Sequence, residues 1–249
     1  MANTVLLLHA GIADSRMWRP QVEVLEPAGY RVIAPDLRGF GDRPLEPAPF
    51  SHLRDAVALL EGPTAVVGNS LGGRVALELA LHRPELVERL VVIAPGLPGW
   101  EWSEETRAGW AAEEAAFEAG DFETAAEETV RLWVDGPNRA SDDVDPDLRE
   151  QVIAMVLRSY ELQKGAWEGG ADEEDVLSPP VGERLAEIRC PTLVLVGEDD
   201  VADMGAIAKH LAASIRDARL GRIAGASHLP SLERPEEVND LLLGFLAEK

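Results

Sequence analysis

The sequence has very little cysteine, with Cys190 as the only one among its 249 residues. A single cysteine cannot form an internal disulfide, so a fold held together by disulfide bonds is excluded. Because Cys190 and Pro191 lead directly into an apolar run, we expect a small buried thiol rather than a reactive one. The sequence also lacks an H-E-x-x-H segment and a cysteine–histidine cluster, and we therefore expect neither a metal site nor a cofactor.

Positive charge is also scarce. Lys+Arg number 23 against 45 Asp+Glu, which gives a formal net charge of -22 at pH 7. Such a charge repels phosphate backbones and anionic membranes, so we expect no nucleic acid and no membrane partner. The first apolar run, residues 5–8, is far too short for a signal core or a membrane span. We expect a cytoplasmic protein, and the sequence leaves open whether it forms a homo-oligomer.

Short apolar runs recur along the chain and alternate with helix-like stretches. Continuous apolar runs of this length are typical of parallel strands that are buried on both faces of a sheet. We therefore predict an α/β fold, with a mostly parallel sheet of about six strands and helices on both faces. The predicted strands are residues 5–8, 31–34, 64–67, 90–94, 192–196 and 219–223.

The alternation stops after the fourth run, and helical spacing takes over. Asp121 and Pro146 supply helix-start signals in this stretch. The predicted helices lie near residues 103–119, 121–134 and 146–163. The predicted division is an α/β core of residues 1–95 and 189–249 and a helical lid insertion of residues 96–188.

The predicted lid is acidic and rich in tryptophan. It holds most of the net negative charge, and we expect its acidic run at residues 172–175 to be a solvated loop. Five of the six tryptophans also fall in it, and two roles are open to them: packing the helices onto the core, or lining an apolar substrate pocket. These five are Trp100, Trp102, Trp110, Trp133 and Trp167.

The strongest local signal is a G-x-S-x-G pattern centred on Ser70. It directly follows the strand-like residues 64–67 and precedes a helix-like stretch, which is the context of a nucleophile elbow. A sharp strand-to-helix turn holds such a serine in a strained conformation, and the flanking glycines allow the backbone to approach closely. We predict that Ser70 is a nucleophile.

A serine hydroxyl needs a base, and the base needs a third group that fixes its tautomer. Among the five histidines, His228 lies after the last predicted strand, in a loop that would open onto the carboxyl edge of the sheet. The acid is one of three consecutive carboxylates, Glu198, Asp199 and Asp200, that follow a predicted strand. A short turn is needed before a side chain can point back towards the histidine, which favours Asp200 over Asp199.

A glycine-containing turn follows the first predicted strand. One of its backbone N–H groups can face Ser70, and with the N–H of Leu71 it would form the two-donor oxyanion hole that acyl transfer requires. We assign this role to Gly11, with Ile12 as the alternative.

Together, the first turn, the serine elbow, the acid and the late histidine resemble the α/β-hydrolase superfamily over essentially the whole chain. In that superfamily the acid is the third residue after the strand-ending glycine, which implies Asp200. The chain order of serine, aspartate and histidine also agrees. The turn from His9 to Trp18 most resembles that of small esterases, perhydrolases and enol-lactonases.

By the same resemblance, the loop from Asp36 to Gly41 would stabilise the fold.

The sequence also differs from two groups of the superfamily that it otherwise resembles. The sequence resembles the minimal form found in plant methylesterases and hydroxynitrile lyases, but it lacks the lysine that the lyases carry close after the histidine. Asn69, directly before the serine, resembles the residue at that position in the carbon–carbon bond hydrolases of aromatic degradation. The glycine-rich oxyanion loop of those enzymes and their tryptophan after the histidine are absent from this sequence.

We therefore expect a serine hydrolase that cleaves carboxylic esters or lactones of small to medium, largely apolar substrates through an acyl-enzyme intermediate. The expected catalytic residues are Ser70, Asp200 and His228, with an oxyanion hole formed by Gly11 and Leu71. Two alternatives remain open: a carbon–carbon bond hydrolase of aromatic degradation, and a receptor-like hydrolase with vestigial turnover.

Overall fold

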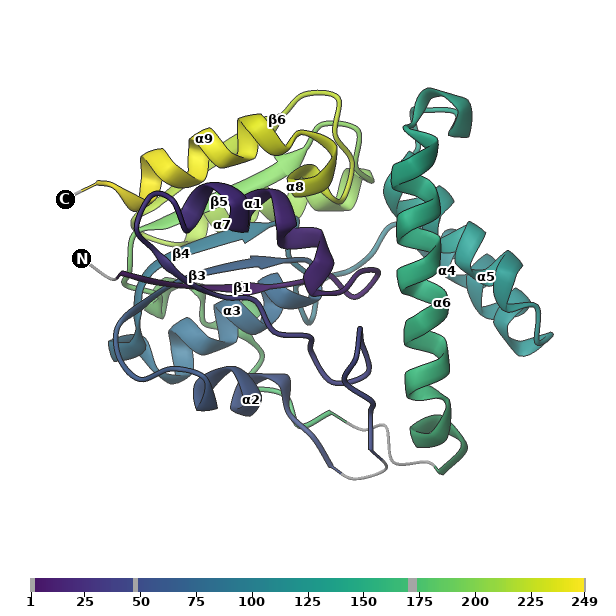
Figure 1. Ribbon diagram of the computed structural model, residues 1–249, viewed down its shortest axis with the longest axis horizontal. Coiled ribbons are helices and arrows are strands. Elements are labelled where there is room, and N and C mark those ends of the chain that lie inside the picture. Colours follow the sequence, from purple (N-terminus) through teal and green to yellow (C-terminus); the bar gives the residue numbers. More distant parts are fainter. Residues whose placement is uncertain (1–2, 47–48, 170–173, 249) are drawn as a thin grey trace.

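The computed structural model describes residues 3–46, 49–169 and 174–248, without the side chains of residues 167–169, so the expected role of Trp167 lies outside the described residues. In this part of the chain, six parallel strands form one sheet (Figure 1). Their order is β2-β1-β3-β4-β5-β6, which confirms the predicted parallel sheet. The strands are β1 (Thr4–Leu8), β2 (Arg31–Ile33), β3 (Thr64–Asn69), β4 (Val87–Ile93), β5 (Thr192–Gly197) and β6 (Ala218–Ile223).

The apolar runs form central strands because both faces of the sheet are buried. Leu6 and Leu8 of β1 pack into one hydrophobic cluster, while Val5 and Leu7 pack into a second cluster on the opposite face. All four side chains are fully buried. Successive side chains of a strand point to opposite faces, so a continuous apolar run fills both clusters at once.

Helices cover each face of the sheet, as the sequence predicts. Helices α2, α3 and α7 pack on the face that holds Leu6 and Leu8, and α1 and α9 pack on the other face (Figure 1). The bounds are α1 (Arg19–Leu25), α2 (His52–Ala58), α3 (Leu71–His82), α7 (Ala202–Ser214), α8 (Pro230–Glu233) and α9 (Pro235–Leu246).

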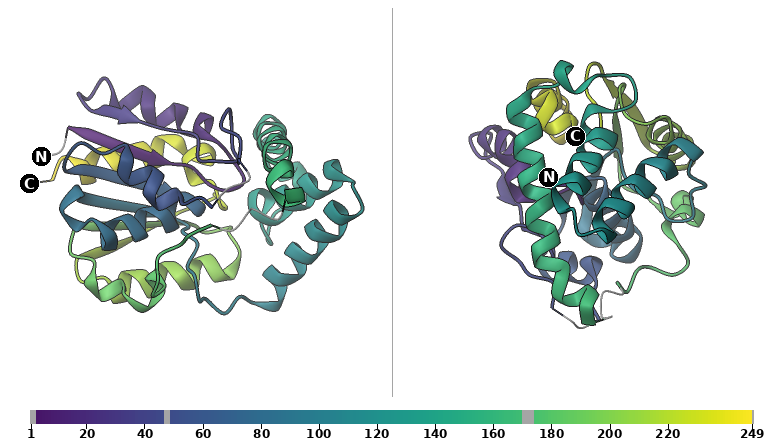
Figure 2. Two further views of the ribbon diagram at one scale, coloured as in Figure 1. Left: turned by 90° about the horizontal axis from the view of Figure 1, so that it is seen from below. Right: turned by 90° about the vertical axis from the view of Figure 1, so that its right-hand side faces the viewer.

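Between β4 and β5, a further group of helices lies at the carboxyl edge of the sheet (Figures 1 and 2). Asp121 begins one of them by accepting the N–H of Thr124 at 3.1 Å, as its N-cap signal predicts. The long helices are α4 (Glu104–Glu118), α5 (Phe122–Val130) and α6 (Pro146–Gly169), and a π-helical turn, η3 (Arg131–Asp135), directly follows α5. We refer to residues 104–169 as the helical insertion.

Candidate active site

Ser70 lies in the sharp turn between β3 and α3. Its φ of 51° and ψ of -110° form a strained conformation for a residue with a side chain. The chain also approaches itself closely here. A Cβ on Gly72 would lie 2.1 Å from the carbonyl oxygen of Leu8, and one on Gly68 would lie 2.2 Å from that of Gly72. Both glycines of the G-x-S-x-G pattern are therefore required by this turn. Ser70 itself is half-buried.

His228 and Asp200 are joined by a hydrogen bond. The Nδ1 atom of His228 lies 2.8 Å from Oδ2 of Asp200, and the two residues are only 2% and 6% exposed. The other carboxylate oxygen, Oδ1, accepts the N–H of Val201 at 2.8 Å. Because an ionised carboxylate can only accept hydrogen bonds, Nδ1 carries the proton in this pair and Nε2 is left as an acceptor.

The two carboxylates before Asp200 have other surroundings. Glu198 is exposed and Asp199 is half-buried. Their backbone N–H groups donate to carbonyls of the chain that leads to His228. Among the described residues, Asp200 is thus the member of the three that contacts the imidazole.

Asn69 connects the serine turn to the loop that carries His228. Its side-chain amide donates to the carbonyl of His228 at 3.1 Å and to that of Ile93 at 3.2 Å, and the side chain is fully buried. Since Asn69 immediately precedes Ser70, these bonds hold the serine turn against residues 224–229, which we call the histidine loop. The Ser70 hydroxyl itself makes no hydrogen bond to His228 within the described residues.

The turn after β1 lies against the first residue of α3. A Cβ on Gly11 would lie 3.6 Å from the Cβ of Leu71, and the N–H of Gly72 donates to the carbonyl of His9 at 3.0 Å. In the described part of the chain, neither the N–H of Gly11 nor that of Leu71 donates to a protein acceptor, and the same is true of Ile12. The geometry therefore brings the expected donors together without choosing between Gly11 and Ile12.

His9 holds this turn in place through hydrogen bonds of both its ring nitrogens. Its Nδ1 bonds the carbonyl of Ala10 at 2.8 Å, and its Nε2 accepts the N–H of Leu37 at 2.9 Å. Burial lowers the pKa of His9, which keeps the ring neutral and able to accept. Asp36 accepts the N–H of Ser15 at 2.9 Å. These bonds agree with the stabilising role expected for the loop that begins at Asp36.

A sequence model described as the Alpha/beta hydrolase family matches residues 5–241. The chain belongs to the alpha/beta hydrolase family. This hydrolase is 28% identical over 269 residues to carboxylesterase YbfK of Bacillus subtilis, covering 98% of this chain and 80% of that one.

The hydrolase is also similar to proteins that are named for other substrates. It is 26% identical over 277 residues to 2-hydroxy-6-oxo-6-phenylhexa-2,4-dienoate hydrolase of Comamonas testosteroni, covering 98% of this chain and 88% of that one. The structure of the enol-lactonase from Burkholderia xenovorans LB400 superposes with a TM-score of 0.79 at 21% identity, covering 100% of this chain and 92% of that one. At that identity, the superposition supports the shared fold alone.

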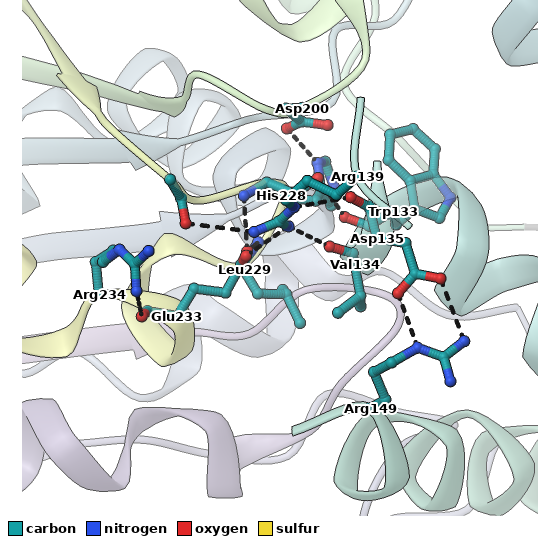
Figure 3. Close-up of polar contacts among 12 residues, drawn as sticks. Trp133, Val134, Asp135, Arg139, Arg149, Asp200, His228, Leu229, Glu233 and Arg234 are labelled. Atoms are coloured by element: carbon teal, nitrogen blue, oxygen red, sulfur yellow. Dashed lines mark hydrogen bonds and ion pairs between the residues drawn. The ribbon is translucent and has the colours of Figure 1, made fainter. Parts of the chain in front are cut away.

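The η3 turn of this hydrolase contacts the histidine loop directly (Figure 3). The carbonyl of Trp133 accepts the backbone N–H of His228 at 3.1 Å and the hydroxyl of Ser227 at 2.8 Å. The Trp133 and His228 rings have centroids 4.3 Å apart, with 40° between their planes. The sequence offers no local signal for this contact, because the two residues are joined only by the fold.

Two further tryptophans extend the aromatic surface away from His228. The ring centroids of Trp133 and Trp110 are 6.2 Å apart, and those of Trp110 and Trp102 are 4.9 Å apart. Trp110 and Trp102 are half-buried against the hydrophobic core. Trp100 instead donates its Nε1–H towards α7. Packing onto the core, one of the two roles left open by the sequence, therefore holds for all four.

The acidic run expected to be a solvated loop is not solvated at Glu174. The Glu174 carboxylate lies 2.6 Å from the guanidinium of Arg74, and only 18% of its side chain is exposed. The expectation was wrong for Glu174 because Arg74 lies on α3 and is brought to it only by the fold. Asp175 is exposed, with 61% of its side chain accessible. Residues 172 and 173 lie outside the described residues.

The thiol of Cys190 is half-buried. Burial raises its pKa to about 11, so the thiol is protonated near neutral pH. Elsewhere in the described residues, no group of three or more His, Cys, Asp and Glu side chains is arranged to hold a metal ion. None of the described helices is both long and apolar enough to span a membrane.

Proposed function

We propose that this protein is a serine hydrolase, with Ser70 as nucleophile, His228 as general base and Asp200 as the acid that orients the histidine. Two features of the structure that occur together support this proposal. A serine at a φ of 51° in a strand-to-helix turn occurs together with a buried histidine whose Nδ1 is 2.8 Å from an aspartate. The Asp200 bond fixes the tautomer, so Nε2 is free to accept the Ser70 proton.

The reaction proceeds through an acyl-enzyme. Ser70 Oγ attacks the carbonyl carbon of an ester or lactone while His228 Nε2 takes the hydroxyl proton. The carbonyl oxygen becomes an oxyanion, which the N–H groups of Gly11 and Leu71 stabilise. When the tetrahedral intermediate collapses, the C–O bond breaks and the imidazolium returns its proton to the departing alkoxide. Water then attacks the acyl-serine by the same route and releases the acid.

We propose a small to medium, largely apolar and neutral substrate. The aromatic side chains of Trp133, Trp110 and Trp102 continue outward from His228 and offer an apolar surface. The helical insertion lies at the carboxyl edge of the sheet, where it would act as a lid (Figure 2). Its excess of carboxylates repels anionic substrates. Similarity to carboxylesterase YbfK supports ester cleavage.

Carbon–carbon bond hydrolysis is the second candidate, because one relative is named as a hydrolase of 2-hydroxy-6-oxo-6-phenylhexa-2,4-dienoate, a compound without an ester bond. The resemblance at Asn69 adds little to it. The Asn69 amide is fully buried and donates to two backbone carbonyls, so its role is to hold the turn rather than to contact substrate. A receptor-like hydrolase with vestigial turnover is the non-enzymatic alternative.

Steady-state hydrolysis of p-nitrophenyl esters of graded chain length tests these functions against one another. We expect continuous turnover that is abolished in Ser70→Ala, which also measures background hydrolysis. A receptor-like protein would release about one equivalent of p-nitrophenol and stop. A carbon–carbon bond hydrolase would cleave dienoic diketones in preference to every ester in the series. Either of these results would overturn the ester or lactone assignment.

A further inference from the structure

Glu233, in α8, holds the backbone on both sides of His228. Its Oε1 accepts the N–H of Ser227 at 2.9 Å and that of Leu229 at 3.3 Å. The side chain is almost completely buried, with 3% of its surface exposed. One carboxylate therefore binds the two amides that flank the proposed base.

Arg139 connects this carboxylate to the helical insertion (Figure 3). Its Nη2 lies 2.7 Å from Oε2 of Glu233. The same guanidinium donates to the carbonyl of Gly225 in the histidine loop at 3.3 Å and to that of Asp135 in η3 at 2.9 Å. It also donates to the carbonyl of Val134. Arg139 thus binds η3 and the histidine loop with one rigid, planar group.

The η3 turn also binds the histidine loop, through a backbone carbonyl. The carbonyl of Trp133 accepts from both Ser227 and His228. Counting the bonds to Glu233, the backbone N–H groups of residues 227, 228 and 229 all have acceptors that lie outside the loop itself. The backbone that carries the imidazole is therefore fixed by α8 on one side and by the insertion on the other.

The charge of Arg139 compensates in part for the burial of the Glu233 carboxylate, although burial still raises the pKa of Glu233. An ionised carboxylate in a buried position is costly unless a cation and hydrogen bonds compensate for its lost hydration. Only 15% of the Arg139 side chain is exposed, so the pair is shielded from solvent. An amide at position 233 would have a single acceptor oxygen, and its NH₂ group would meet the donors of Arg139 if that oxygen faced Ser227.

We infer that Arg139 and Glu233 are positioning residues for His228, and that through this buried ion pair the helical insertion sets the direction of the imidazole. This inference rests on the proposed function, which assigns His228 as the base. A catalytic group has to stay within about 0.5 Å of its productive position. Release of residues 227 and 229 from Glu233 would let the ring shift relative to Asp200, and the direction of Nε2 would change with it. The loss falls on kcat, because neither positioning residue contacts the substrate.

Two variants test the ion pair. Glu233→Gln keeps the side-chain size and removes the charge, while Glu233→Asp keeps the charge and shortens the reach. We expect kcat on p-nitrophenyl acetate to fall by about tenfold to a hundredfold in each, with KM within about twofold of the wild type. Arg38→Met is the matched control. It breaks the ion pair of Arg38 with Asp55, which is 2.6 Å long and away from the histidine loop, and should leave kcat unchanged.

A second readout does not depend on turnover. In protein labelled with ¹⁵N-histidine, the Nδ1–H resonance of His228 reports its hydrogen bond to Asp200. We expect this resonance to shift or broaden in both Glu233 variants and to stay unchanged in Arg38→Met. A folded Glu233 variant with wild-type kcat and a wild-type resonance would overturn the inference. Equal loss of kcat in Arg38→Met would do the same, because it would show a general effect of stability.

The two proposals fail separately. If the wild-type protein hydrolyses no ester, the proposed function fails, and the resonance still reports whether Glu233 orients His228. If the wild type turns over and the resonance does not respond to either Glu233 variant, the inference fails and the proposed function stands. Should Glu233→Gln not fold, Glu233→Asp alone decides the outcome.

Discussion

His228 Nδ1 and Asp200 Oδ2 lie 2.8 Å apart in surroundings that exclude almost all solvent from both side chains. Asp199, one residue earlier, has the same charge but is half-buried, and its backbone N–H donates to the carbonyl of Ala226. The chain therefore supplies a matched pair of neighbouring acids, of which one bonds the imidazole.

Asp200→Asn should keep the fold and lower kcat by a factor on the order of 10⁴, because the amide favours the wrong histidine tautomer. Asp199→Asn is the control and should change kcat by less than about tenfold, since a nearby charge contributes far less than an orienting hydrogen bond. Steady-state rates on p-nitrophenyl acetate and circular dichroism of both variants check this. The reverse ranking would mean that Asp199 is the acid and that the assignment to Asp200 is wrong by one residue.

Substitution at Trp110 should alter substrate preference rather than basal rate. Trp110→Ala removes the middle member of the aromatic surface that begins beside His228. We expect the ratio of kcat/KM for hexanoate to that for acetate to fall by about tenfold, because longer acyl chains need this apolar contact. Equal losses on the two esters would show that Trp110 only packs the insertion onto the core.

Asp203 of α7 should stabilise the start of the helical insertion. Its carboxylate accepts from the hydroxyls of Ser103 and Thr106, both at 2.6 Å, and from Trp100 Nε1 at 3.3 Å. Burial alone would raise the pKa of Asp203, but these hydrogen bonds outweigh it and lower the pKa below its ordinary value of 3.8. We expect Asp203→Asn to reduce the free energy of unfolding by about 1–3 kcal/mol at pH 7.

The pH dependence of that loss follows from the sign of the shift. A carboxyl group with a lowered folded-state pKa stabilises the fold above its unfolded pKa, and this contribution disappears as pH falls through the folded value. The difference between wild type and Asp203→Asn should therefore be complete at pH 7 and shrink below about pH 4. Urea unfolding at several pH values measures it, with exposed Asp217→Asn as the control. A difference that grows on acidification would contradict this role.

Cys190 should react slowly with iodoacetamide at pH 8. Its thiol pKa is raised by burial from 9.0 to about 11, so folding lowers the thiolate fraction at this pH by a factor on the order of 10². Mass spectrometry of the native and urea-unfolded protein should show faster alkylation after unfolding by about that factor. Equal rates would mean that the thiol is accessible and ionised in the folded state.

The sheet could be predicted from the sequence because its signal is local. Each apolar run is bounded by helix-like residues. In β1, the adjacent Leu6 and Leu7 pack into clusters on opposite faces of the sheet, so a continuous apolar run predicts a strand that is buried on both faces. The serine turn could also be predicted from adjacent residues, because the G-x-S-x-G pattern lies between a strand-like and a helix-like stretch. In both cases a few adjacent residues determine the backbone.

Contacts between distant segments could not be predicted where no motif marks the residues. Helical spacing over residues 121–134 indicated one continuous helix, whereas the chain enters a π-helical turn at Arg131. Nothing near Trp133 signals that its carbonyl will bind His228. Glu174 looked like part of a solvated loop for the same reason, because its partner Arg74 is a hundred residues earlier in the chain.

Covalent labelling with a fluorophosphonate probe tests the central claim most directly, because only an activated serine attacks such a phosphorus centre. The account predicts one label per chain, located at Ser70 by peptide mass spectrometry. It also predicts no labelling of Ser70→Ala, and slower labelling of Asp200→Asn and of a His228→Ala variant. Full labelling of Ser70→Ala, or a label on any other residue of the wild-type protein, would contradict it.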